Sequence, residues 1–73
     1  MKLADRIVAD ADTCSGHPRV DGTRIRVSQI LGMLAAGMTP EEIVADYPPV
    51  SVADIQACLA FAASKIDVPS AAE

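Results

Sequence analysis

Aromatic residues and cysteines are scarce in this 73-residue chain. It contains one Phe, one Tyr and no Trp, so its core must be built from aliphatic side chains. The two cysteines are too few for a disulfide framework, because Cys14 stands in a polar stretch and Cys58 in an apolar one. The length allows one domain, and so small a domain buries only about 60% of its unfolded surface. With 51% hydrophobic residues, we expect apolar surface left over for a partner subunit.

Long hydrophobic runs are also missing. No window holds eighteen uninterrupted apolar residues, and the first residues, MKLADRIVADAD, carry acids where a signal peptide needs an apolar run. These absences predict no membrane association and a cytoplasmic location.

The residues that usually carry catalysis are nearly absent. The only histidine, His17, follows Cys14 by three positions, and this pair offers two ligands where a closed zinc site needs four. A metal would require Asp10, Asp12 or a second chain as well. The four glycines do not have the spacing of a phosphate-binding loop. We therefore expect a protein that is not an enzyme and that has no metal and no cofactor.

Basic residues are few, and they are unevenly distributed. The formal net charge is −4, which argues against non-specific binding of nucleic acid, because such binding needs clustered cations. However, Arg19, Arg24 and Arg26 fall within eight residues, whereas four acids lie in the later helical part: Glu41, Glu42, Asp46 and Asp54. The pattern predicts a basic hairpin and an acidic helical body.

The first third of the chain has the pattern of short strands. Residues 5–9 resemble a strand, and residues 10–18 are rich in turn-forming residues. Asp21-Gly22 between two short runs is a strong hairpin signal, since both positions tolerate positive φ. On the second arm Ile25 and Val27 alternate with Arg24 and Arg26, which predicts one apolar and one cationic face.

Three helices are predicted in the rest of the chain. Ser28 is the expected cap of the first, which ends at Gly37, where a left-handed residue is needed. Thr39-Pro40-Glu41-Glu42 has the form of a capping box with proline at the first helical position, and Pro48-Pro49 ends this second helix. Ser51, with Asp54 three residues later, opens the third.

The third helix is expected to run from Val52 to about Lys65. Apolar residues at helical spacing predict one buried stripe, which consists of Val52, Ile55, Leu59, Ala62 and Ile66. The opposite positions are Ala53, Gln56, Ala57, Ala60 and Ser64. An Ala-rich face suits packing against another helix better than it suits base readout.

The two capped helices separated by residues 47–50 have the proportions of a helix-turn-helix. In this interpretation the candidate DNA contacts are Arg19, Arg24, Arg26, Gln56 and Lys65. The arginines would bind phosphates, or they would pair with an acidic protein surface. The alternative is that they form only the solvated face of a small sheet.

Several segments together resemble the DUF433 family. They are Gly16-His17-Pro18, Gly22-Thr23-Arg24-Ile25-Arg26-Val27, Gly37-Met38-Thr39-Pro40-Glu41-Glu42-Ile43, Asp46-Tyr47-Pro48 and Asp54-Ile55. The resemblance covers residues 6–66. It implies a homeodomain-like three-helix core with an N-terminal β extension, often dimeric. It also implies pairing with a PIN-like nuclease toxin, and in some members the DNA-binding part of a VapB-type antitoxin.

The sequence thus predicts an α+β, mostly α fold in a single domain over residues 1–66. This comprises a β extension over 5–27, a three-helix bundle over 28–66, and a flexible tail over 67–73. The resemblance implies an antitoxin-like homodimer of a prokaryotic toxin–antitoxin system that binds a PIN-like toxin, with its own promoter DNA as a second ligand through the helix-turn-helix. The alternative is a protein-binding or dimerisation module with no nucleic-acid role.

Overall fold

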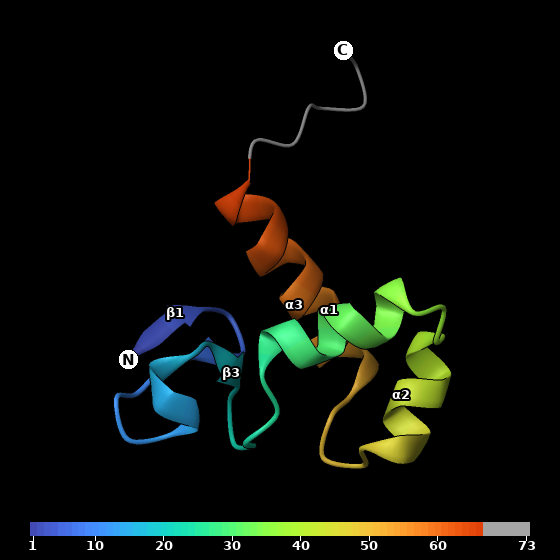
Figure 1. The fold of residues 1–73 in the computed structure, drawn as a ribbon, viewed down its shortest axis with the longest axis horizontal. Helices are drawn as coiled ribbons and strands as arrows, with labels where there is room; N and C mark the ends of the chain where they lie inside the picture. The colour runs from blue at the N-terminus through green and yellow to red at the C-terminus, as the bar shows by residue number, and fades with distance from the viewer. Residues whose placement is uncertain (67–73) are drawn as a thin grey trace.

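A computed structural model describes residues 1–66, which form a small sheet followed by three helices (Figure 1). The strands are β1 (Lys2–Ala4), β2 (Ile7–Val8) and β3 (Arg19–Val20), and the helices are α1 (Val27–Ala35), α2 (Pro40–Asp46) and α3 (Val52–Lys65). A short 3₁₀ turn, η1 (Cys14–Gly16), lies between β2 and β3. The predicted fold class, α+β and mostly α, is confirmed. The tail predicted over 67–73 lies outside the described residues.

The sheet is antiparallel, with the strand order β1-β2-β3. Its centre is β2, where Ile7 lies opposite Val20 and both side chains are fully buried. The strand predicted over 5–9 is therefore wrong in its bounds, because Arg6 has a φ of 67° in the turn that joins β1 to β2. β1 was not predicted, because its three residues have no pattern of their own and become a strand only by pairing with β2.

The predicted hairpin is correct at its turn and wrong in its second arm. Gly22 has a φ of 81°, and the N–H of Val20 donates to the carbonyl of Ile25 at 2.9 Å. This bond is part of an isolated bridge that joins Arg19 to Arg26, and residues 24–27 add no strand to the sheet. The main partner of β3 is β2, so residues 24–27 are not a strand with alternating faces.

Helix α1 begins earlier than its predicted cap. Its N-cap is Arg26 and not Ser28, because the bridge to β3 continues directly into the first helical turn. The N–H of Val27 donates to the carbonyl of Pro18 at 3.0 Å, and the side chain of Gln29 accepts from the N–H of Arg26 at 3.4 Å. Backbone pairing has replaced the serine cap.

The end of α1 follows the sequence prediction. Gly37 has a φ of 98°, which only glycine adopts without strain. The N–H of Gly37 donates to Leu34 and that of Met38 to Met33, at 3.0 and 3.1 Å. This pair of bonds is the Schellman motif, which satisfies carbonyls that have no partner inside the helix.

Reciprocal capping boxes open α2 and α3, as predicted. Thr39 accepts from the N–H of Glu42 at 3.1 Å, and Glu42 accepts from the N–H of Thr39 at 2.9 Å. Ser51 and Asp54 exchange the same two bonds at 3.2 and 2.9 Å. Each box satisfies amides that the first helical turn leaves unpaired.

One core joins the sheet to the helices within residues 1–66. Its buried members are Ile7, Val20, Val27, Ile30, Ile43, Val50, Ile55, Cys58 and Phe61. They come from β2, β3, every helix and the turn before α3. The three helices also pack pairwise against one another. The core is aliphatic apart from Cys58 and Phe61, as the composition requires.

Helix α3 buries a different face from the predicted one. Its buried residues are Asp54, Ile55, Cys58 and Phe61. Of the predicted stripe, Val52, Leu59 and Ile66 are instead 47%, 41% and 66% exposed. The helix is turned by roughly one residue position, or about 100°.

The cause of this rotation is the inward position of Asp54. If charged side chains are expected at the surface and apolar ones in the core, Asp54 is placed outside and Leu59 inside. In the structure the Asp54 carboxylate caps the helix and pairs with Arg6, so it tolerates burial. Cys58 and Phe61 then fill the core beside Ile55, and Val52, Leu59 and Ile66 are left exposed.

Candidate functional site

The candidate site is the outward face of α3. Helices α2 and α3 are joined by a short connection over residues 47–51 and pack against α1, as in a helix-turn-helix. The C-terminal half of α3 extends beyond α1 and α2 (Figure 1). Residues 57–63, Ala-Cys-Leu-Ala-Phe-Ala-Ala, form two turns that are apolar in every direction. A helix of this composition is normally covered on all sides, and here one side is not.

Three large side chains define this uncovered side, which we call the α3 stripe: Val52, Leu59 and Ile66. They are three of the four large hydrophobic residues that are exposed among residues 1–66. Their spacing of seven residues places them nearly in line along the helix. Exposed alanines on the same side leave room for a second backbone to approach closely.

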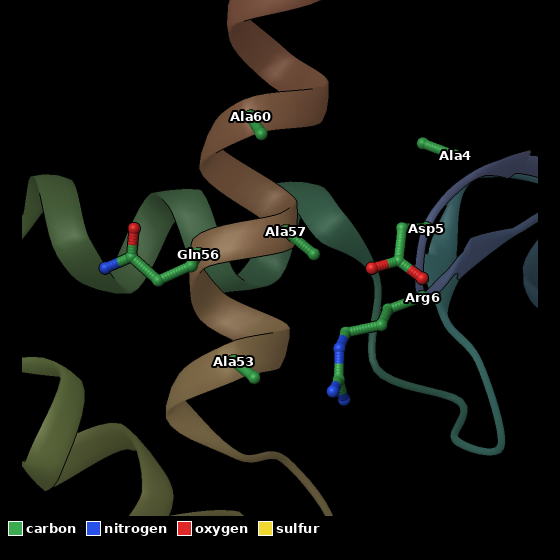
Figure 2. Close-up of a pocket in the computed structure, with 7 residues that line it drawn as sticks. All are labelled: Ala4, Asp5, Arg6, Ala53, Gln56, Ala57 and Ala60. Carbon is green, nitrogen blue, oxygen red and sulfur yellow. The ribbon is translucent and has the colours of Figure 1, made fainter.

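A groove adjoins the stripe between α3 and the β1–β2 turn, and we call it the outer groove (Figure 2). It has a volume of about 550 Å³ and is lined by Ala4, Asp5, Arg6, Ala53, Gln56, Ala57 and Ala60. Ala57 points toward Asp5, whereas Gln56 points away from the β1–β2 turn (Figure 2). Alanine methyl groups of α3 form the floor of this groove, and the carboxylate of Asp5 and the guanidinium of Arg6 lie on the opposite wall.

Arg6 and Asp54 hold the two walls of the outer groove together. The Arg6 Nη1 lies 3.2 Å from the Asp54 Oδ1, across 48 residues of sequence. The Asp54 side chain is only 12% exposed. Burial alone would raise the pKa of Asp54, but the hydrogen bonds from the backbone and hydroxyl of Ser51, together with Arg6, outweigh it and lower the pKa below 3.8.

This ion pair predicts a pH dependence of stability. A carboxylate with a lowered pKa in the folded chain contributes stability that is present above pH 3.8 and is lost as the pH falls through the folded-state pKa. Asp54→Asn should therefore cost about 1–2 kcal/mol at pH 7 and progressively less in acid. Urea unfolding at pH 7 and at lower pH measures both values. Asp46→Asn, an exposed carboxylate of α2, is the control. An equal loss at all pH values would contradict the assignment.

Arg19, one of the predicted DNA contacts, is turned inward. Its Nε donates to the carbonyl of Thr23 at 3.0 Å, and its Nη2 pairs with Asp10 at 3.1 Å. Its side chain is 13% exposed. The guanidinium therefore stabilises the loop around Asp21-Gly22 and presents little surface to a partner.

The other two predicted arginines lie just before α1. Arg24 is exposed, and its carbonyl accepts a bond from the Cys14 thiol at 3.2 Å. Arg26 is half-buried. Since Arg19 points toward Asp10, the structure does not place three guanidiniums on one open surface.

The two predicted contacts on α3 line different grooves. Gln56 is exposed beside the outer groove, whereas Lys65 lies in a second groove, between α3 and α1. The Lys65 Nζ stands 5.2 Å from the centre of the Phe61 ring, a cation–π contact. The five predicted DNA contacts thus do not converge on one site, and their role stays a prediction.

The cysteines do not form a reactive pair. Burial, and to a lesser degree the charge of Asp54, raises the pKa of the Cys58 thiol to about 11, so this thiol stays protonated near neutral pH. Cys14 lies in the left-handed turn η1, with its thiol on the carbonyl of Arg24. Within residues 1–66, no three His, Cys, Asp or Glu side chains gather as metal ligands would.

Sequence reasoning missed Arg6 and the α3 stripe. The partner of Arg6 is far away in sequence, so no local pattern could have identified it. The stripe was visible as a seven-residue repeat of Val52, Leu59 and Ile66, but the pattern was assigned to the core. The excess of hydrophobic residues was a signal that not every apolar stripe could be internal.

In the described part of the chain, every helix is too short or too polar to span a bilayer. Taken together, the described residues form a small α+β domain with an exposed apolar stripe on α3 and two grooves beside that helix. Residues 7–62 match the family described as "Protein of unknown function (DUF433)", and the chain belongs to this family.

One solved structure is similar over most of the chain. It is the crystal structure of a DUF433 member protein from Anabaena variabilis ATCC 29413, with a TM-score of 0.78 and 26% sequence identity. The match covers 85% of this chain and 61% of that one, so the present chain corresponds to less than two thirds of its structural relative. No curated protein matches the sequence.

Proposed function

We propose that this protein is an antitoxin-like binding protein. In this proposal it is a homodimer that holds a PIN-like nuclease toxin through protein–protein contacts. It acts by binding and not by catalysis, and it works in the cytoplasm.

The observation that carries the proposal is the uncharged outer side of α3. Large apolar side chains at a seven-residue spacing are costly to leave in water, at about 25 cal/mol per Å² of apolar surface. Covering the α3 stripe by a second copy removes this cost and adds to the core, which within residues 1–66 has nine buried apolar residues. Association is a usual remedy for such small domains.

Binding of promoter DNA is the second candidate function. The arrangement of α2 and α3 favours it, because the second helix of such a pair reads base edges, and Gln56 is an exposed amide on that helix. However, alanines flank Gln56, and the net charge is −4. The electrostatic attraction that supplies most non-specific affinity is therefore weak, and we rank protein binding first.

Co-expression with a PIN-like nuclease from the same host tests the proposal. We expect the pair to co-purify, and we expect added protein to inhibit RNA cleavage by the nuclease in proportion to the complex formed. An upstream DNA fragment, tested by gel retardation at low salt, decides the second function separately. A protein that is monomeric and leaves nuclease activity unchanged would refute the proposal.

A further inference from the structure

A second groove, which we call the α1–α3 groove, is lined by nine residues and has a volume of about 290 Å³. Its walls come from the first turns of α1, the last turns of α3 and the loop at His17-Pro18. The α1 wall contributes Val27 and Leu31, and the α3 wall contributes Phe61, Ala62 and Ile66. The size is near the lower end of the ~300–1,000 Å³ of ligand pockets, which is room for a few apolar side chains.

The lining of this groove carries a positive charge, whereas the whole chain has a negative net charge. Acids outnumber Lys and Arg by 10 to 6, yet none of the nine lining residues is acidic, and Lys65 is the one Lys or Arg among them. The Lys65 ammonium is kept at the groove by the Phe61 ring, 5.2 Å away. His17 is exposed at the loop wall and adds a polar group. Among the nine lining residues, a carboxylate placed beside Lys65 would find a cation and no competing acid.

We infer that the α1–α3 groove binds an amphipathic helix of a partner protein, with apolar side chains in the groove and a carboxylate beside Lys65. A helix lies in such a groove through residues at i, i+3, i+4 and i+7, and an acidic neighbour of that stripe selects its orientation. This inference rests on the proposed function, since it names the surface that would receive the partner. A second copy of the chain is a poorer occupant, because none of its helices within residues 1–66 carries an exposed acid beside exposed large apolar side chains. Helix α2 has exposed acids but no exposed large hydrophobic residue, and the one acid of α3, Asp54, is buried.

Two synthetic peptides of about 16 residues, long enough to form a helix, test the inference. Both carry the same leucine stripe, which is flanked by Glu in one peptide and by Lys in the other. We expect the Glu peptide to shift the amide NMR signals of Val27, Leu31 and Ala62, which lie in the groove and outside the α3 stripe, and to bind at least ~10-fold more tightly than the Lys peptide, a difference of about 1.4 kcal/mol.

Charge variants make the test specific. Lys65→Glu should reverse the order of the two peptides, and Lys65→Gln should abolish the preference. Lys2→Glu, which changes an exposed lysine on β1, should leave it intact. Equal affinity for both peptides, or signal shifts outside the groove, would overturn the inference. So would signals of Val27, Leu31 and Ala62 that move only with protein concentration, because the occupant of the groove would then be a second copy.

The same variants separate this inference from the proposed function. If Lys65→Glu still forms a dimer and still inhibits the nuclease, while neither peptide binds wild-type protein, the groove assignment fails and the proposed function stands. If the peptides bind as expected but no nuclease is inhibited, the groove assignment stands and the antitoxin-like function fails.

Discussion

Ile55→Ala is expected to lower the free energy of unfolding by about 2–5 kcal/mol. Ile55 is fully buried where α3 meets the core, so truncation leaves a cavity as well as losing apolar contact. Small domains have about 5–15 kcal/mol of stability at most, and this variant is therefore close to the limit of folding. Ile55→Val, which removes one methylene, should cost about 0.5–1.5 kcal/mol and remain measurable by urea unfolding followed by circular dichroism.

Leu59→Ala is the matched control for the orientation of α3. The sequence pattern places Ile55 and Leu59 on the same buried stripe, whereas in the structure Leu59 is 41% exposed. A partly exposed side chain should cost much less to truncate, and any loss should depend on protein concentration if a second chain covers it. A loss at Leu59 as large as that at Ile55, and independent of concentration, would support the sequence-based register and contradict the structure.

The contrast between these two residues shows what sequence reasoning could establish. The caps at Thr39 and Ser51 and the end of α1 at Gly37 were predicted correctly, because each depends on hydrogen bonds within a few residues. The fold class followed from these local signals together with the turn at Asp21-Gly22. Local chemistry was sufficient wherever the partner atoms are near in sequence.

Two of the errors have the opposite cause. Arg6 pairs with Asp54 across 48 residues, and this contact permits an acid to face the core. Arg19 bonds to Asp10 and to the loop that follows β3, which removes it from the predicted cationic face. Both of these errors concern a charged group whose partner comes from another segment of the chain. An excess of apolar surface was therefore predictable from the composition, but the side chains that form it were not.

Leu59→Glu combined with Ile66→Glu is expected to abolish self-association. Both side chains belong to the α3 stripe, and burying two carboxylates without partners in a helix–helix contact is strongly unfavourable. Residues at the centre of such an interface commonly contribute 2 kcal/mol or more, so the dissociation constant should rise at least ~100-fold, or about 2.7 kcal/mol. Sedimentation equilibrium should show a fall from twice the chain mass to that of a single 7.6 kDa chain.

Ser64→Glu is the control for this experiment, since it adds a carboxylate to the same helix at an exposed position off the stripe. It should leave the wild-type mass unchanged. Because the stripe residues are exposed in the single chain, the double variant should keep its helical circular dichroism while losing its dimer. A wild-type protein that sediments as a monomer, or a double variant that stays dimeric, would remove the α3 stripe from the interface. In the latter case the edge of β1, which pairs on one side only, would be the next surface to test.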